Sequence, residues 1–363
     1  MDADLIVVGA GQSGLAAAFA AERAGAGAIV LDSSESLGGS WPRYYDSLRL
    51  FSPARFSSLP WRPFPGDPDR YPGRDEVVEY LAGCAGDLDA DVRLGFEVTS
   101  VTIGTGGEFR VRGPDGSELL ARGLIAATGS FQSPRRPRLP GLDSFAGQVL
   151  HASEYHAPEF VMGERVLVVG GGNSAVQVAA ELAESRQVTL ATRSPLRWIG
   201  QRPLGRDLHW WLGRTGLDTA PIGRWLRRTP PVVDNGLYRA AIATGRPHHR
   251  LLFERLDGED VVWPDGSQEK IDAVVLATGY RPHLPYLAGT GALDDEGLPL
   301  HSGGSSTTVA GLSYVGLEHQ RSFASATIRG VGRDAERVVR SLPLTGETAP
   351  SKRPACCTRP AYP

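Results

Sequence analysis

The sequence predicts an α/β fold made of two related strand–turn–helix–strand modules, with the second module inserted into the first. Three observations predict it. Two glycine-rich turns each follow a short apolar run and precede a helical run, and the two copies have the same internal spacing. Each copy is also followed by a Pro-Asp-Gly-Ser turn and then by an Ala-Thr-Gly triplet. Order and spacing that repeat together are typical of a duplicated supersecondary unit.

The first module starts at the N-terminus. Residues 5–8 form an apolar run that we expect to be a strand, the glycine turn covers 9–14, and residues 15–24 have a helical pattern. The next strand, 28–31, ends at Asp32. The first glycine of the turn therefore precedes the acid at the strand end by 23 positions.

The second module repeats this order. A strand at 165–169 leads into a turn at 170–175, a helix at 176–184 and a strand at 188–192, which ends at Arg193. The first glycine again precedes the residue at the strand end by 23 positions. An Arg now stands where the first module has an acid, so we expect the two modules to bind different ligands.

A β-meander is expected after each module. The Pro-Asp-Gly-Ser turn at 114–117 precedes the Ala-Thr-Gly triplet at 127–129 by 13 positions, and the turn at 264–267 precedes the triplet at 277–279 by the same distance. An Asp-Gly pair between β-rich runs is a strong hairpin signal. We expect the two triplets to lie where the chain crosses between the modules.

The nested order fixes the expected domains. A helix at 322–342 is expected to return to the first module, which gives a first domain of residues 1–157 and 276–342 and a second domain of residues 158–275. The remaining residues, 343–363, are rich in Pro, Thr, Ser and Arg, and we expect a flexible tail there. The candidate buried positions of the last helix are Ser325, Ile328, Val331, Val338 and Val339.

The first glycine turn has the pattern of a dinucleotide site. Gly9 permits the tight turn, Gly11 lets the backbone approach a pyrophosphate, and Gly14 lets the helix pack closely on the strand. The helix N-terminus then faces the phosphates, and Asp32 can accept hydrogen bonds from ribose hydroxyls. A nucleotide without a 2′-phosphate suits this module, so we expect FAD here.

The second turn predicts a second nucleotide. Arg193 matches a 2′-phosphate, which an acid would repel, so we expect NADPH. Two adjacent sites of this kind imply hydride transfer from NADPH to a bound flavin. The residues expected to hold NADPH are Gly170, Gly172, Asn173, Ser174, Ala175 and Arg193.

A third pattern lies just before the second module: Phe145-x-Gly147-x-x-x-His151-x-x-x-Tyr155. With it, the sequence resembles the flavin-containing monooxygenases over about residues 4–342, and within them the short bacterial arsenic-operon type. The resemblance implies a glutathione-reductase-like flavoprotein fold with two dinucleotide-binding domains. Further residues expected at the cofactors are Gly39 and Trp41, from the match Gly-Gly-Ser-Trp, and Gly129 and Gly279, which end the two triplets.

The same resemblance implies a reaction. NADPH reduces FAD, oxygen adds to the flavin C4a atom to give a hydroperoxide, and the oxidised nicotinamide stays bound and shields that intermediate from water. A soft nucleophilic heteroatom of a small-molecule substrate then takes the distal oxygen. The substrate classes that this implies are a trivalent arsenical and the sulfur or nitrogen of a small metabolite.

Two segments supply the candidate catalytic residues. Phe51 stands where animal-type relatives have an active-site Asn, which argues against direct N-oxygenation of amines. The insertion at 198–211 mixes polar and aromatic residues and contributes Gln201, Arg202, Asp207 and His209. This insertion is either a lid or substrate wall over the flavin or a helix whose Trp residues pack into a domain or homodimer interface. His151 is expected to be a hinge residue between the modules.

Composition limits the other functions. The net charge is −3, from 38 Lys and Arg against 41 Asp and Glu, and no basic stripe predicts binding to nucleic acid or to a membrane surface. The apolar runs are too short for a transmembrane helix, and the N-terminus does not have the pattern of a signal peptide. Three cysteines do not make a disulfide framework, so we expect a reducing, cytoplasmic location.

Two alternatives stay open from the sequence. One is a flavin reductase that passes electrons to a protein or a disulfide, although no Cys-x-x-Cys motif is present. The other is a flavin-bound sensor without enzyme activity. No zinc-like cluster of His residues predicts a metal site. Cys356 and Cys357 are either soft-metal ligands or incidental thiols of the tail, and we favour the second interpretation.

Overall fold

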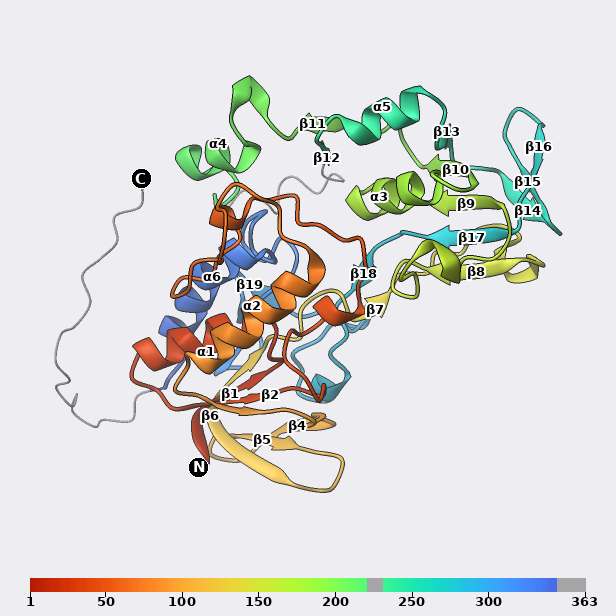
Figure 1. Cartoon of the computed structure of the whole chain (residues 1–363). Coiled ribbons are helices and arrows are strands. Elements are labelled where there is room, and N and C mark those ends of the chain that lie inside the picture. The colour runs from red at the N-terminus through yellow and green to blue at the C-terminus, as the bar shows by residue number, and fades with distance from the viewer. Residues whose placement is uncertain (221–230, 345–363) are drawn as a thin grey trace.

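A computed structural model of the chain describes residues 1–220 and 231–344 (Figure 1). Two sheets with their helices lie beside one another, and the chain passes from the first to the second and back again. Within the described residues, no helix has the length and apolar character needed to cross a bilayer.

The first sheet has the strand order β19-β20-β21-β6-β1-β2-β3, and its central pairs β2–β1–β6–β21 are parallel. The strands β4 and β5 form an antiparallel meander with the outer half of β6. The bounds are β1 Ala3–Val8, β2 Ala28–Leu31, β3 Asp91–Arg93, β4 Ser100–Ile103, β5 Phe109–Arg112, β6 Glu118–Ala126, β19 His301–Ser302, β20 Ser305–Ser306 and β21 Leu312–Tyr314.

The second sheet is parallel throughout, with the order β13-β10-β9-β17-β8. Its meander is β14-β15-β16, the short ladder β11–β12 lies outside it, and β7 pairs with β18 where the chain crosses between the sheets. The bounds are β7 Ser133–Pro134, β8 Gln148–His151, β9 Arg165–Val169, β10 Gln187–Thr192, β11 Trp198–Gly200, β12 Val232–Asp234, β13 His248–Leu251, β14 Arg255–Asp257, β15 Asp260–Val262, β16 Gln268–Lys270, β17 Ala273–Leu276 and β18 Tyr280–Arg281.

Helices cover both sheets (Figure 1). The α-helices are α1 Gln12–Arg23, α2 Arg74–Gly86, α3 Asn173–Leu182, α4 Leu208–Thr215, α5 Leu237–Ala243 and α6 Ile328–Ser341. Short 3₁₀ turns are η1 Trp41–Arg43, η2 Ala54–Phe56, η3 Leu142–Ser144, η4 Pro158–Phe160, η5 Pro203–Gly205 and η7 Pro285–Leu287.

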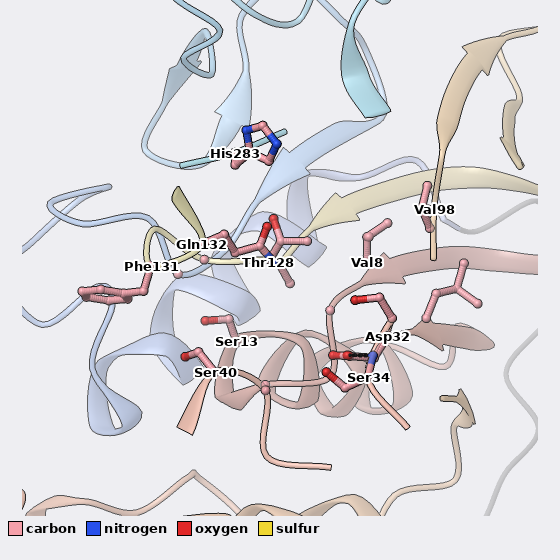
Figure 2. A pocket seen from close by; sticks show the side chains of 18 of the residues that line it. Val8, Ser13, Asp32, Ser34, Ser40, Val98, Thr128, Phe131, Gln132 and His283 are labelled. Carbon is pink, nitrogen blue, oxygen red and sulfur yellow. Dashed lines mark hydrogen bonds between the residues drawn. The ribbon is translucent and has the colours of Figure 1, made fainter. Parts of the chain in front are cut away.

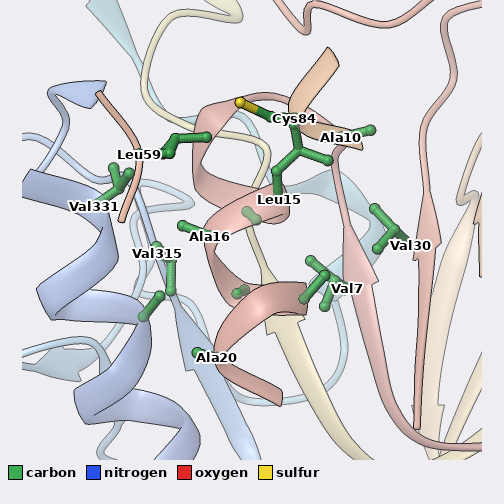
Figure 3. Packing of buried hydrophobic residues seen from close by; sticks show 14 of the residues in the cluster. Val7, Ala10, Leu15, Ala16, Ala20, Val30, Leu59, Cys84, Val315 and Val331 are labelled. Atoms are coloured by element: carbon green, nitrogen blue, oxygen red, sulfur yellow. The ribbon is translucent and has the colours of Figure 1, made fainter. Parts of the chain in front are cut away.

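The first core is packed between the first sheet, α1 and α6. The alanines of α1, among them Ala16 and Ala20, are nearly fully buried, and small side chains let α6 approach closely. Figure 3 shows these alanines beside Val315, which directly follows β21, and Val331 of α6. The helix α6, although last in the described chain, therefore completes the core of the first sheet.

The predicted fold class is confirmed: two sheets with parallel central strands each have a glycine turn and a meander, and the second lies within the first in sequence. Both expected hairpins form, because β5 pairs with β6 and β15 with β16. By strand pairing, the second sheet starts with β8 at Gln148, before the predicted boundary at residue 158. The division into domains stays a prediction.

Two boundary predictions are wrong. The last helix starts at Ile328 and not at residue 322, because the Ser325 hydroxyl accepts hydrogen bonds from the backbone N–H groups of Arg321 and Ser322. Such bonds compete with helix formation. The tail does not start at 343, since Leu344 is buried against the first core. The rest of the predicted tail, with Cys356 and Cys357, lies outside the described residues.

Candidate active site

A cavity opens at the carboxyl ends of β1, β2 and β6 (Figure 2). Its volume is about 1090 Å³ when the open solvent at its mouth is included. The sequence-predicted cofactor residues that line it are Gly9, Gly11, Asp32, Gly39 and Gly129.

The glycine turn makes room for this cavity. Gly9 has φ +107°, and a Cβ there would lie 2.8 Å from the carbonyl oxygen of Ala127. Gly14 lies outside the cavity, but any side chain on it would overlap the carbonyl oxygen of Gly9. A Cβ on Gly39 would lie 2.7 Å from the Cα of Gly11. The backbone therefore passes through a space that side chains would fill.

Asp32 is fixed at one end of the cavity. One of its carboxylate oxygens accepts a hydrogen bond from the Ala10 N–H at 2.6 Å, and the other accepts one from the Ser34 N–H at 2.8 Å. Figure 2 shows it at the side of Val98, with Ser40 and Phe131 at the opposite side. The carboxylate is thus held where it can accept further hydrogen bonds from a ligand.

The opposite end of the cavity is organised by Gln12. Its amide accepts a hydrogen bond from the Trp41 indole N–H at 3.0 Å and reaches the carbonyl of Ala326 at 3.5 Å. Gln12 and Ala326 line the cavity, whereas Trp41 does not. Trp41 therefore positions a lining residue instead of lining the site itself.

These residues fit an extended dinucleotide such as FAD. The cavity has an acid at one end for a ribose, a glycine turn with the start of α1 for a pyrophosphate, and an opposite end between Phe131 and Ala326. A longer side chain at the glycine positions would close it.

The second glycine turn lies at the carboxyl end of β9 and differs in detail from the first, with φ +153° at Gly170 against +107° at Gly9 and with Ala175 where the first turn has Gly14. A side chain on Gly170 would overlap the carbonyl oxygen of Ala277, as the equivalent contact does in the first turn, whereas Gly172 faces open space. Ala175 is buried under the turn. The second turn therefore shares the close contact at its first glycine with the first turn and is open towards solvent at Gly172.

The other predicted NADPH residues lie around this turn. The Asn173 side chain accepts a hydrogen bond from the Val233 N–H at 2.9 Å, so it also holds β12. Ser174 and Arg193 are exposed, Arg193 at the end of β10. Gly279 adopts φ +82° and does not line the cavity of the first turn. Its carbonyl oxygen instead accepts a hydrogen bond from His151.

His151 joins the strand β8 to the crossing at Gly279. Its Nε2 lies 3.1 Å from the Gly279 carbonyl oxygen, which can only accept, so Nε2 carries the proton. Its Nδ1 accepts a hydrogen bond from the Ser153 N–H at 3.1 Å. Burial lowers the pKa of His151, which favours the neutral ring. These contacts support the expected hinge position.

We expect a loss of stability as the pH falls below about 6.5, the pKa of an unperturbed His. Because the folded His151 has the lower pKa, the unfolded chain binds the proton first, and protonation would set Nδ1–H against the Ser153 N–H. Each such group lowers the free energy of unfolding by at most about 1.4 kcal/mol per pH unit. Thermal midpoints between pH 7.5 and 5.5 should fall less steeply in His151→Gln than in the exposed-site control His248→Gln; equal slopes would contradict this.

Four of the five predicted catalytic residues meet in one cluster, although Phe51 and the insertion are far apart in sequence. The Gln201 amide donates hydrogen bonds to the Phe51 carbonyl at 3.0 Å and to Asp207 at 2.8 Å. His209 contacts Asp207 through Nδ1 at 3.0 Å, and its ring lies 5.9 Å from that of Phe51. Arg202 is exposed and outside these hydrogen bonds.

The sequence interpretation missed Tyr71 as a member of this cluster. Its hydroxyl donates a hydrogen bond to Asp207 at 2.6 Å, across 136 positions of sequence. Burial raises the pKa of Asp207, but the hydrogen bonds from His209, Tyr71 and Gln201 outweigh this and bring the pKa to about 2. Asp207 is therefore a carboxylate at neutral pH.

The segment that follows the insertion contacts α6 and the residues just before it. The Ala324 N–H donates a hydrogen bond to the Asp218 carbonyl at 3.0 Å, and the Asp218 side chain pairs with Arg329. Ala324 precedes the cavity-lining Ala326 by two residues. The chain from β11 to Asp218 therefore leads from the second sheet to the segment before α6, and Figure 1 shows α4 above α6.

Trp210 and Trp211 contact the insertion itself, whereas Trp198 packs against the core of the second sheet. The Trp211 indole N–H donates a hydrogen bond to the Pro203 carbonyl at 3.0 Å, and Arg206 stacks over Trp210 at 4.5 Å. This favours the wall interpretation, although a homodimer interface stays a prediction. Within residues 1–220 and 231–344, no group of three or more His, Cys, Asp or Glu side chains could hold a metal ion.

Comparison with known proteins agrees with this geometry. A model of the family described as pyridine nucleotide-disulphide oxidoreductase matches residues 6–203. An uncharacterized CzcO-like oxidoreductase of Geobacillus kaustophilus is 32% identical over 93% of this chain and 98% of its own length. Indole-3-pyruvate monooxygenase YUCCA1 of Oryza sativa subsp. japonica is 35% identical, covering 77% of each chain. The structure of a flavin-containing monooxygenase from Stenotrophomonas maltophilia superposes with a TM-score of 0.83 at 33% identity, over 94% of this chain and 98% of that one.

Proposed function

Because the chain belongs to the pyridine nucleotide-disulphide oxidoreductase family and, within it, to the flavin-containing monooxygenases that use FAD and NADPH, we propose that it oxygenates a soft nucleophilic heteroatom of a small molecule. The substrates we propose are a trivalent arsenical or a sulfur- or nitrogen-bearing metabolite. The observation that carries the proposal is the cavity at the first glycine turn, whose lining residue Ala326 lies two residues after Ala324, which is bonded to Asp218 in the segment that follows the insertion.

The proposed roles follow the two turns. Bound FAD, reduced by NADPH, supplies the oxygen-transfer chemistry. The first turn and Asp32 would hold FAD, and the second turn with Arg193 would hold NADPH. The candidate substrate-side residues are Phe51, Gln201, Arg202, Asp207 and His209.

A second substrate class has its own support. The rice relative at 35% identity is described as an indole-3-pyruvate monooxygenase. An aryl 2-oxo acid is therefore the second candidate, and it differs from the first in that a carbonyl carbon is oxidised instead of a soft heteroatom.

Oxygen labelling tests the proposal. We would reduce the FAD-loaded protein with NADPH without air, then mix it with ¹⁸O₂ and with methylarsenite, an alkyl thiol or indole-3-pyruvate, and identify the products by mass spectrometry. One ¹⁸O atom per NADPH in an arsenic or sulfur product supports the first class, and label in a decarboxylated product supports the second. Full recovery of the electrons as hydrogen peroxide with every substrate would contradict a monooxygenase.

A further inference from the structure

The carboxylate of Asp207 is saturated with hydrogen-bond donors. It accepts bonds from the Tyr71 hydroxyl at 2.6 Å, the Gln201 amide at 2.8 Å, the His209 backbone N–H at 2.8 Å and the His209 Nδ1 at 3.0 Å. Its side chain is 11% exposed and that of His209 is 6% exposed. A charge buried with four donors has a fixed position, so it holds the imidazole in one orientation.

This arrangement fixes the proton on His209. A carboxylate only accepts, so Nδ1 carries the hydrogen, and in the neutral ring Nε2 presents a lone pair. In the part of the chain that the structure describes, no group forms a hydrogen bond with Nε2. Nε2 is not one of the fully buried polar atoms that lack a partner in the described residues. A ligand can therefore reach this oriented acceptor and donate a hydrogen bond to it.

The surroundings of His209 fit a substrate wall. The rings of Phe51 and Phe56 lie 5.9 and 6.4 Å from the imidazole and within about 32° of its plane. The insertion that carries His209 continues to Asp218, which is bonded to the segment beside the cavity-lining Ala326. One polar atom is therefore set against apolar rings, an arrangement that selects ligands by a single hydrogen bond.

We propose that Nε2 of His209 accepts a hydrogen bond from an exchangeable proton of the substrate, carried on or beside the atom that is oxygenated. The enzyme then prefers protic substrates, with As–OH, S–H or N–H groups, to their fully alkylated counterparts. His209 is the specificity-determining residue, and Asp207, Tyr71 and Gln201 are positioning residues that act through it. The inference rests on the proposed oxygenation of a soft heteroatom.

Matched substrate pairs test it. A thiol is compared with its S-methyl ether, and methylarsenite with trimethylarsine, by the kcat/KM for the oxygenated product. We expect the wild-type protein to favour the protic member by roughly 10- to 100-fold. The variant His209→Phe keeps a ring beside Phe51 and Phe56 without an acceptor. The protic-to-aprotic ratio of kcat/KM should therefore fall to about 1, because only the kcat/KM for the protic substrate decreases.

A second variant tests the positioning residues. Tyr71→Phe removes one of the four donors to Asp207 and should raise the KM of the protic substrate by roughly 3- to 10-fold, with the kcat nearly unchanged. The control Tyr314→Phe also removes one buried hydroxyl, which donates a hydrogen bond to the Ala292 carbonyl at 3.1 Å. Tyr314 forms no hydrogen bond with Asp207 or His209. It should leave the protic-to-aprotic ratio as in the wild type.

The outcomes separate this inference from the proposed function. A wild-type protein that oxygenates neither member of any pair contradicts the proposed function itself. A wild-type protein that oxygenates both members equally, or a His209→Phe variant that lowers both by the same factor, overturns the role of His209 and leaves the oxygenation standing.

Discussion

A Gly14→Ala variant is expected to lose FAD. The Cβ of an Ala at this position would overlap the carbonyl oxygen of Gly9, and that atom belongs to the backbone, so the turn has to move. Overpacking against backbone costs at least a few kcal/mol, and the turn is the part that would face the pyrophosphate. We expect the dissociation constant of FAD to rise by roughly 100-fold or more, equivalent to about 2.7 kcal/mol.

The measurement is FAD retained after gel filtration, followed by titration of the apoprotein with FAD. Gly86→Ala is the matched control, because Gly86 ends α2 with a negative φ and no atom within 4 Å of a new Cβ. Far-ultraviolet circular dichroism separates loss of FAD from loss of folding. Normal FAD affinity in folded Gly14→Ala would show that the first turn does not bind the cofactor.

An Arg193→Asp variant is expected to lose NADPH selectivity. Arg193 is exposed at the end of β10, where the first module has Asp32, so its guanidinium is free to meet a 2′-phosphate. A charge-assisted hydrogen bond is worth about 1.5–3 kcal/mol, and the new carboxylate adds repulsion. We expect the KM for NADPH to rise by roughly 100-fold, and that for NADH by less than about 3-fold.

Anaerobic flavin reduction with each nucleotide measures this without any substrate. Arg340→Asp makes the same charge change at an exposed position near the end of α6 and should leave both constants as in the wild type. If Arg193→Asp raises the KM for NADPH and the KM for NADH by the same factor, Arg193 does not bind the 2′-phosphate.

The sequence predicted those parts of the fold that local spacing determines. Gly9 and Gly170 occupy turns that only glycine fits, and the strands and helices around them follow from short apolar runs. The predicted start of α6 was wrong because the Ser325 hydroxyl accepts hydrogen bonds from the backbone before it. Such bonds compete with helical hydrogen bonds, and hydrophobic periodicity does not reveal them.

Only part of the candidate site could be predicted from the sequence. Asp32 and the glycines carry a local pattern, so they could be named before the fold was known. The bond between Tyr71 and Asp207 joins two segments that only the packing of the insertion brings together. Gln12 was missed in the same way, because its link to Trp41 and Ala326 depends on three separate parts of the chain.

The nested order of the two sheets has a consequence for synthesis on the ribosome. The strands β1, β2 and β6 emerge early, but β21, which pairs with β6 from Leu312 to Tyr314, and the covering helix α6 come last. Until then β6 has an open edge, which is a template for aggregation. The second sheet, complete by Leu276, can form during this interval. We expect a nascent chain arrested near residue 320, where β17 has left the ribosomal tunnel and β21 has not, to resist protease between 148 and 276 and to be cut readily between 1 and 126.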